Sequence, residues 1–414
     1  MKVLKKILVS HPTGNANVRS LLEGLVNHHL LYAFYTGVAV FPGNFWSLVA
    51  YLPGLSDFKR REFDDNLRTY TKSHPIRELG RLLSSKVGLS PLIQHEHGFF
   101  SVDQNYRHLD LQVSKAFKKT STIKAVYAYE DGALISFVQA KKNKIRCFYD
   151  LPIGYWRAMR SLLEPEIKAR PEWKATMTGF QDSQDKVARK DQEIELADHI
   201  FVASRFTKKT LEQFPKILPP VHIIPYGFPQ TTSCKTYRKI QGSPLKLLFV
   251  GGLSQRKGIA QLFEACSSLQ ETVTLKIIGN KAVQDCQILN ASLEQINWVP
   301  SLPHKSILKE MRKADIFVFP SLFEGYGLVI AEAMAQGTPV ITTDRTCGAD
   351  YIDHGKNGWL IEAGNTAALK QQLYNLTQNP EVIAKVGKAA FRTARANPSS
   401  EYGSKMAKLL IQLI

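Results

Sequence analysis

Runs of apolar residues that predict buried strands alternate along the chain with stretches whose apolar residues recur at helical spacing. In the first half, strands are predicted at 5–11, 122–131, 144–152, 198–204 and 221–229. Helices are predicted at 19–30 after a polar loop at 12–18, and at 132–143, 185–197 and 204–214, the last with Ser204 as N-cap. Such alternation is typical of a parallel α/β sheet.

The same alternation restarts after a polar stretch at 230–243, which predicts a linker between two domains. Strands are expected at 245–254, 272–280, 295–300, 314–321, 338–344 and 358–364, and helices at 367–378, 381–396 and 400–414. The predicted division is a domain at 1–230, a second at 231–395 and a final segment at 396–414. Residues 42–112 mix aromatic, basic and turn residues without a readable pattern.

Composition places the chain among soluble globular proteins, since 44% of its 414 residues are hydrophobic and 22% are charged. No run of about 18 apolar residues occurs, so no membrane span is expected. The basic, apolar N-terminus is interpreted as a first strand and not as a signal peptide. The five cysteines are scattered, odd in number and without metal-ligand spacing, which favours a reducing, cytoplasmic compartment.

A net charge of +18 favours an anionic partner, such as nucleic acid, an anionic membrane face, a phosphorylated lipid acceptor or a nucleotide diphosphate, although solubility alone also explains it. No recognised nucleic-acid-binding motif accompanies the basic residues, so nucleic acid is not expected. A peripheral membrane contact is predicted at 44–61, unless its apolar residues pack in the core. There Phe45, Trp46, Leu48, Val49 and Tyr51 precede Lys59, Arg60 and Arg61.

Candidate chemistry concentrates at 314–332, where a buried strand is followed by a Gly-bearing loop and a helix that begins near Leu328. Open α/β sheets bind ligands beyond the carboxyl ends of their strands, and a helix N-terminus attracts phosphate. Glu324 in the loop and Glu332 in the helix can point into one crevice and accept hydrogen bonds from sugar hydroxyls. The alternative is that a glutamate here only complements the helix dipole.

Four ordered segments resemble the retaining glycosyltransferases with two Rossmann-like domains, the GT-B type of group 1 or family 4. They are HIIPYGF, LLFVGGLSQRKGIAQLFEA, EGYGLVIAEAMAQGTPV and CGADYIDHGKNGWLIEAGN. The resemblance implies two such domains facing across a cleft, with 396–414 packing back on the first. It further implies transfer of a hexose from a nucleotide sugar, UDP-linked rather than GDP-linked, to a glycan or lipid-linked acceptor of the cell envelope. It implies no metal and no cofactor; a nucleotide-sugar epimerase or hydrolase of the same fold is the alternative.

The resemblance also assigns roles in the second domain. Arg256 and Lys257 would hold the donor diphosphate, Glu324 the donor sugar and Glu332 the ribose. Backbone N–H groups of Gly325, Tyr326, Gly327 and Leu328 would lie near the sugar and the diphosphate. Gly252 stands where many relatives carry an arginine, so Arg256 is expected to supply that charge.

The first domain matches less closely. Gly14 and Asn15 are candidates for donor contact, or they only form a turn. Glu130 and Asp131 stand where relatives carry a His-x-His type motif and could orient the acceptor hydroxyl, unless Asp131 only caps the helix. Residues 149–152 end the next strand and are expected to face the same crevice, with Asp150 as the acceptor-side candidate among them. His95 and His97 have no metal-ligand spacing and are interpreted as loop residues.

Overall fold

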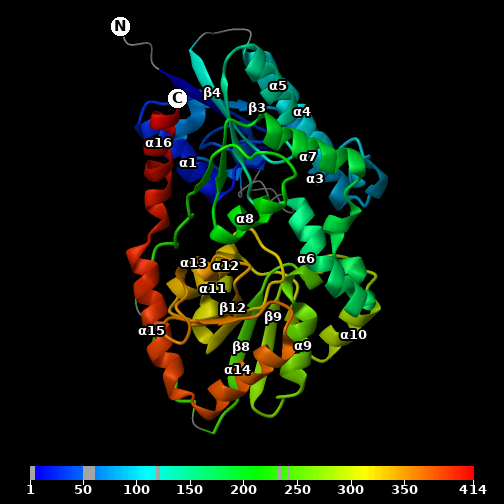
Figure 1. The fold of residues 1–414 in the computed structure, drawn as a ribbon, viewed down its shortest axis with the longest axis vertical. Helices are drawn as coiled ribbons and strands as arrows, with labels where there is room; N and C mark the ends of the chain where they lie inside the picture. Colours follow the sequence, from blue (N-terminus) through cyan, green and yellow to red (C-terminus); the bar gives the residue numbers. More distant parts are fainter. Residues whose placement is uncertain (1–4, 50–60, 118–121, 232, 234, 241) are drawn as a thin grey trace.

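The computed structural model describes residues 5–49, 61–117, 122–231, 233, 235–240 and 242–414, and it contains two α/β domains stacked along the long axis (Figure 1). Each domain is a wholly parallel sheet covered by helices, as the strand–helix alternation predicts. No helix among the described residues is long and apolar enough to cross a membrane.

The first domain has a seven-stranded sheet in the order β3-β2-β1-β4-β5-β6-β7. Its strands are β1 (Lys6–Ser10), β2 (Leu31–Thr36), β3 (Thr71–Ser73), β4 (Ile123–Tyr129), β5 (Arg146–Asp150), β6 (His199–Val202) and β7 (Val221–Ile223). Its helices are α1 (Ala16–Asn27), α2 (Phe45–Val49), α3 (Pro75–Lys86), α4 (Val102–Ala116), α5 (Leu134–Lys142), α6 (Trp156–Ala169), α7 (Gln184–Leu196) and α8 (Arg205–Thr210).

The second domain has a six-stranded sheet in the order β10-β9-β8-β11-β12-β13. Its strands are β8 (Leu245–Val250), β9 (Val273–Ile278), β10 (Asn297–Val299), β11 (Ile316–Phe319), β12 (Val340–Thr343) and β13 (Trp359–Ile361). Its helices are α9 (Ile259–Ser267), α10 (Gln287–Glu294), α11 (His304–Lys313), α12 (Leu328–Ala335), α13 (Gly348–Tyr351), α14 (Thr366–Gln378) and α15 (Glu381–Ala396).

The strand order of each parallel sheet reverses once, and the points of reversal position the candidate site. The chain builds one half of each sheet outward from β1 or β8, and then returns to the other side of that strand with β4 or β11. Ligands of open α/β sheets bind at such switch points, beyond the carboxyl ends of the strands. The loops after β1, β4, β8 and β11 are therefore the places where a ligand is expected.

The last helix, α16 (Tyr402–Leu413), leaves the second domain and packs along α1 of the first, as the family resemblance implied (Figure 1). The two helices touch closely, because a Cβ built on Gly24 would lie 2.1 Å from the carbonyl oxygen of Gly403. The two chain crossings between the domains are adjacent, since Phe228 forms a β-bridge with Pro398.

Several predicted boundaries were wrong for local reasons. The first helix begins at Ala16 and not at 19, because the Asn15 side chain accepts a hydrogen bond from the backbone N–H of Val18 and caps it. Strand β2 was missed, as was α6, which has Pro165 inside it. The unreadable stretch 42–112 holds α2, β3, α3 and most of α4. In contrast, Ser204 caps α8 as predicted, by accepting from the N–H of Thr207.

The predicted membrane segment is only partly described. Tyr51, Lys59 and Arg60 lie outside the described residues. The side chain of Phe45 is 67% exposed. Arg61 was expected to face lipid, and this was wrong, because its guanidinium is buried in an ion pair with Glu78.

Candidate active site

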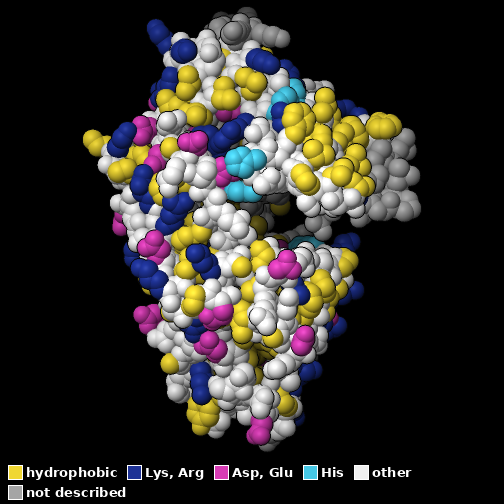
Figure 2. Space-filling view, turned by 90° about the vertical axis from the view of Figure 1, so that its right-hand side faces the viewer, with side chains coloured by type: hydrophobic (Ala, Val, Ile, Leu, Met, Phe, Trp, Pro, Cys, Tyr) yellow, Lys and Arg dark blue, Asp and Glu magenta, His cyan; other side chains and the backbone are white. Residues whose placement is uncertain are grey.

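A cavity of about 260 Å³ opens between the domains at the carboxyl ends of β8 and β11. Its lining joins the first domain, the connecting segment and the second domain: Asn15, Asn17, Pro152, Tyr226, Val250, Gly251, Gly252, Lys257, Phe319, Glu324, Tyr326, Gly327, Leu328 and Val329. Figure 2 shows the molecule hollowed between its two domains. The cavity therefore coincides with the switch point of the second sheet.

Two cations and one carboxylate dominate the chemistry of this cavity. The Lys257 ammonium forms an ion pair with the Glu324 carboxylate and lies 5.0 Å from the centre of the Phe319 ring. Arg256 Nη1 lies 3.6 Å from Glu324 Oε1 and donates to the carbonyl oxygen of Phe323 at 2.7 Å. Two positive charges thus face one negative charge, which leaves a net positive site for an anion.

Burial shapes the proton affinity of both cations. It lowers the pKa of Arg256 to about 10. It also lowers the pKa of Lys257, an effect to which the charge of Arg256 adds, while the paired Glu324 carboxylate opposes it. A bound diphosphate would restore the pKa of both groups, because each cation would gain negative charge beside it.

The start of α12 supplies backbone donors to the same cavity. Gly327 adopts φ +86°, a left-handed conformation that glycine reaches without strain, and it turns the chain into α12. Gly327, Leu328 and Val329 line the cavity, so unpaired N–H groups of the first helical turn are available for phosphate oxygens. Lysine, arginine and a helix N-terminus together form a strongly anion-binding arrangement.

The loop before α12 is clamped against the first domain. The carbonyl oxygen of Gly325 accepts from the hydroxyls of Ser204 at 2.6 Å and Thr207 at 2.8 Å. A Cβ on Gly325 would lie 1.9 Å from the carbonyl oxygen of Pro152. The Tyr326 hydroxyl accepts from the backbone N–H of Gly227 at 3.1 Å. The position of the Glu324 loop therefore depends on contacts with the other domain.

Not every predicted second-domain residue lines this cavity. Lys257, Glu324, Gly252, Tyr326, Gly327 and Leu328 do, while Arg256, Gly325 and Glu332 do not. Glu332 Oε1 lies 2.9 Å from His304 Nε2 at the start of α11, farther along the helix from the cavity lining. At Gly252 a Cβ would meet nothing within 4 Å, which leaves room for ligand.

Of the first-domain candidates Gly14, Asn15, Glu130, Asp131 and Asp150, Asn15 lines the cavity and the others do not. Gly14 is buried, has φ +59°, and its N–H donates to His11 Nδ1 at 2.9 Å; a Cβ there would meet the Phe63 ring at 2.3 Å. Gly14 thus fits the turn interpretation. Pro152, from the segment 149–152 that was expected to face the crevice, also lines the cavity. Asn17 and Tyr226 line it and were not predicted; the one available signal was Tyr226, which precedes the glycine of the HIIPYGF segment.

Glu130 and Asp131 are partly buried and do not line the cavity. Glu130 lies 3.6 Å from Lys190 Nζ, and burial raises its pKa to about 7. Asp131 pairs with Arg189 at 2.9 Å. The alternative interpretation, in which Asp131 caps α5, was wrong, because its side chain makes no capping hydrogen bond there. That helix is capped by Glu193, which accepts from the N–H groups of Asp131, Ala133 and Leu134.

Asp150 is also enclosed at the end of β5, where the Tyr127 hydroxyl donates to its Oδ2 at 2.5 Å. Burial raises the pKa of Asp150 to about 7, against the opposing effect of this hydrogen bond. The carboxyl group faces tyrosines and not the crevice that the sequence suggested.

One cluster in the first domain has metal-ligand character. Ligand atoms of His95, Glu96 and Asp182 lie within 4.8 Å of one another. However, the Lys186 ammonium already lies 3.0 Å from Asp182, and Glu96 accepts from both the N–H and the hydroxyl of Ser183. These partners satisfy the carboxylates, so we assign no metal to the cluster.

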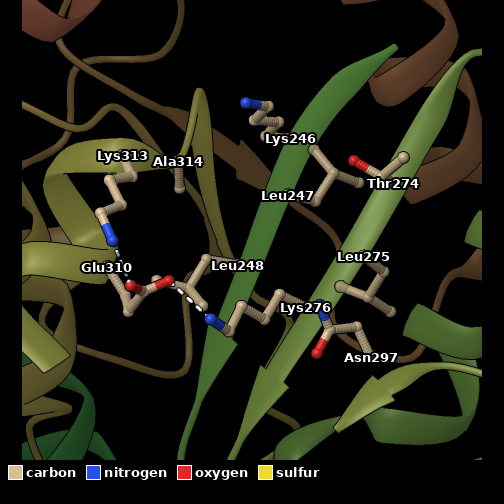
Figure 3. Close-up of a pocket in the computed structure, with 10 residues that line it drawn as sticks. All are labelled: Lys246, Leu247, Leu248, Thr274, Leu275, Lys276, Asn297, Glu310, Lys313 and Ala314. Atoms are coloured by element: carbon tan, nitrogen blue, oxygen red, sulfur yellow. Dashed lines mark hydrogen bonds and ion pairs between the residues drawn. The ribbon is translucent and has the colours of Figure 1, made fainter.

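A second cavity, of about 240 Å³, lies against β8, β9 and the end of α11 (Figure 3). The Glu310 carboxylate accepts from Lys276 at 2.7 Å and from Lys313 at 2.8 Å. Its lining on β8 starts at Lys246, near the amino end of the strand, whereas the interdomain cavity lies at the carboxyl end. It is therefore not at the switch point.

Comparisons with known proteins agree with this geometry. Residues 235–393 match the family model described as glycosyl transferases group 1. The amylovoran biosynthesis glycosyltransferase AmsK of Erwinia amylovora is 31% identical over 177 residues, which cover 40% of this chain and 42% of that protein. The match thus spans about two fifths of the curated relatives' length.

Solved structures match almost the whole chain. Sucrose-phosphate synthase from Thermosynechococcus elongatus aligns with a TM-score of 0.65 at 16% identity over 99% of both chains. Anabaena HepE, in complex with UDP and glucose, aligns with a TM-score of 0.63 at 16% identity over 99% of this chain and 100% of that one. Residues 235–393 therefore match the group 1 glycosyltransferases, and the fold of the whole chain is that of these two-domain structures.

Proposed function

We propose that this protein is a retaining glycosyltransferase that moves a hexose from a nucleotide sugar, UDP-linked rather than GDP-linked, to a glycan or lipid-linked acceptor. The observation that carries the proposal is the Lys257–Glu324 ion pair beside the N-terminus of α12, in a cavity that both domains line, with Arg256 3.6 Å from Glu324. A relative named for amylovoran biosynthesis supports an acceptor in exopolysaccharide or cell-envelope synthesis. We place the reaction in the cytoplasm, at or near the membrane face.

In the proposed reaction the donor diphosphate binds between Lys257, Arg256 and the first turn of α12. The bond from the anomeric carbon to the diphosphate breaks, and negative charge develops on the leaving oxygen. Cations and backbone dipoles fixed before reaction stabilise that charge without reorganising, which is the largest catalytic effect in many enzymes. Lys257 and Arg256 can do this together with the helix, so the reaction would not require a metal.

Glu324 is the only carboxylate among the described residues that line the cavity. Enzymes that retain configuration through a covalent intermediate use two carboxyl groups about 5 Å apart, one as nucleophile and one as acid. Here the single carboxylate is occupied by Lys257 and Arg256. The arrangement favours a role for Glu324 in holding sugar hydroxyls, with the departing diphosphate accepting the proton of the incoming hydroxyl.

The test begins with a thermal-shift panel of UDP-, GDP- and ADP-sugars. A ligand at about 100 times its Kd stabilises the folded state by about 2.7 kcal/mol, so the correct donor is distinguishable. Proton NMR of the product of that donor, with water or an added saccharide as acceptor, then reports the configuration first formed at the anomeric carbon. We expect a UDP-sugar to bind and the configuration to be retained.

The outcomes separate the parts of the proposal. If no nucleotide sugar stabilises the protein, the proposal that it is a glycosyltransferase is wrong. If the configuration at the anomeric carbon is inverted in the product, only the retaining mechanism is wrong. Release of UDP with an epimerised sugar and no transfer to any acceptor would identify an epimerase of the same fold. Stronger stabilisation by a GDP-sugar would correct the nucleotide.

A further inference from the structure

Helix α3 of the first domain packs Leu79 and Leu82 inward, yet it also exposes large apolar side chains and buries a charged one. Ile76 is 75% exposed, Leu83 55% and Val87 67%. At about 100° per residue these three positions fall within about 40° of one another around the helix axis, so they form one stripe. Surface helices of soluble proteins normally turn the apolar stripe toward the core.

The buried side of α3 carries Glu78, which is 1% exposed. Its carboxylate is compensated by an ion pair with Arg61, by Arg81 at 2.8 Å and by the amide of Asn105 at 2.7 Å. A buried charge is tolerated only with such partners. The orientation of α3 is thus specified by a dedicated polar network, and its outward apolar stripe follows from that orientation.

The stripe continues on to the neighbouring segments. Helix α3 packs against the short 3-10 helix at Ser90–Ile93 and against α4. The N–H of Phe100 donates to the carbonyl oxygen of Leu92, and the Arg77 guanidinium lies 4.4 Å from the centre of the Phe99 ring. The resulting surface, which we call the α3 patch, consists of Ile76, Leu83, Val87, Leu89, Leu92, Phe99 and Val102, all at least 37% exposed.

Figure 2 shows hydrophobic side chains gathered on this side of the first domain. Soluble monomers rarely expose so many large apolar groups together without a partner.

The charges around the α3 patch indicate which partner it fits. Residues 71–102 are all described, and their two carboxylates, Glu78 and Glu96, are buried. The cations Lys72 and Lys86 are exposed. An apolar segment that carries exposed lysines and, within residues 71–102, no exposed carboxylate is complementary to anionic lipid headgroups above an acyl layer.

We propose that the α3 patch is a docking surface for an anionic lipid bilayer. Apolar side chains of the patch enter the headgroup boundary, while Lys72 and Lys86 contact anionic headgroups. This inference goes beyond glycosyl transfer and places the contact at α3, not at the segment 44–61. It is tested by binding alone, so its failure leaves the proposed reaction untouched, and failure of the reaction leaves it standing.

The experiment is co-sedimentation of the full chain with vesicles of mixed phosphatidylglycerol and phosphatidylcholine, and with pure phosphatidylcholine as comparison. We expect binding to the anionic vesicles that weakens as salt is raised. The triple variant Ile76→Ser, Leu83→Ser and Val87→Ser should lower the partition coefficient at least about tenfold. Lys72→Gln with Lys86→Gln should lower it several-fold at low salt and less at high salt.

A matched control replaces exposed apolar side chains outside the α3 patch, Ile217→Ser of the first domain and Ile288→Ser of the second, and should bind as the wild type does. UDP binding and thermal melting check that each variant is folded. Wild-type-like sedimentation of the triple variant, or no sedimentation of the wild type with anionic vesicles, would overturn the proposal. So would a dimer in analytical ultracentrifugation that the triple variant dissociates, because the patch would then bind a second copy.

Discussion

Replacing Lys257 by methionine tests the centre of the candidate site most directly. The substitution preserves most of the apolar stem beside Phe319 and removes the ammonium that pairs with Glu324. If this ammonium stabilises the leaving diphosphate, its loss costs about 10²–10³ in rate, or about 2.7–4 kcal/mol of transition-state stabilisation. Because the group is buried, water cannot fully replace it.

The same substitution also leaves the Glu324 carboxylate with Arg256 as its remaining cation, at 3.6 Å. Removing one partner of a fully buried pair costs about 3–5 kcal/mol, but the remaining arginine reduces that cost here. A double variant, Lys257→Met with Glu324→Gln, separates the two effects. Its melting temperature should return toward that of the wild type, because no unpaired carboxylate remains. Its turnover should stay low, because no ammonium stabilises the leaving group.

The assay is initial-rate UDP release with the donor found in the thermal-shift panel, together with calorimetric UDP binding. Lys246→Met is the control, since Lys246 is a lysine of the same strand–loop unit that lies by the second cavity (Figure 3). The control should keep wild-type turnover. Wild-type turnover in Lys257→Met, or activity restored by the double variant, would refute the assigned role of Lys257.

Three further predictions follow from other parts of the site. Glu332→Ala should raise KM for the donor at least about tenfold with kcat nearly unchanged, because a ribose contact does not change during reaction; a kcat loss with unaltered UDP affinity would contradict it. Gly325→Ala should lower both Tm and activity, because its Cβ would lie 1.9 Å from the Pro152 carbonyl oxygen; a wild-type melting curve would show that the domains adjust freely. Asp150→Asn should gain stability relative to wild type as pH rises from about 4 to about 7 and then level off. The folded pKa of about 7 exceeds the usual 3.9, so the native state holds a proton that the unfolded state releases in this window. Urea unfolding at several pH values measures the difference, and a difference independent of pH would contradict the assignment.

The second domain could be predicted well because its signals are local. Glu324 and Gly327 lie within one short loop, and Lys257 ends the short 3-10 helix that follows β8. The apolar runs that predict the strands, and the glycines beside them, therefore also predict where these three residues lie. Residues that the family resemblance assigned to the diphosphate and the sugar come together at the switch point of the sheet.

The first domain could not be predicted so well, because its polar groups are paired across long sequence distances. Asp131 meets Arg189, and the cap of α5 comes from Glu193 on α7. No pattern around 130 reveals these partners. Helix α3 is harder still, since it lies in the stretch 42–112 where no pattern was readable, and the burial of Glu78 against Arg61 that orients it shows only in the structure.

The packing of α16 on α1 has a consequence for biosynthesis. During translation α1 emerges first, yet the helix that covers it at Gly24 is made only after the whole second domain. The first domain therefore cannot complete its packing on the ribosome until residues 402–413 have emerged, whereas most of the second domain emerges before them. A nascent chain stalled before Tyr402 should thus expose an uncovered α1 and be a better chaperone substrate than the released protein.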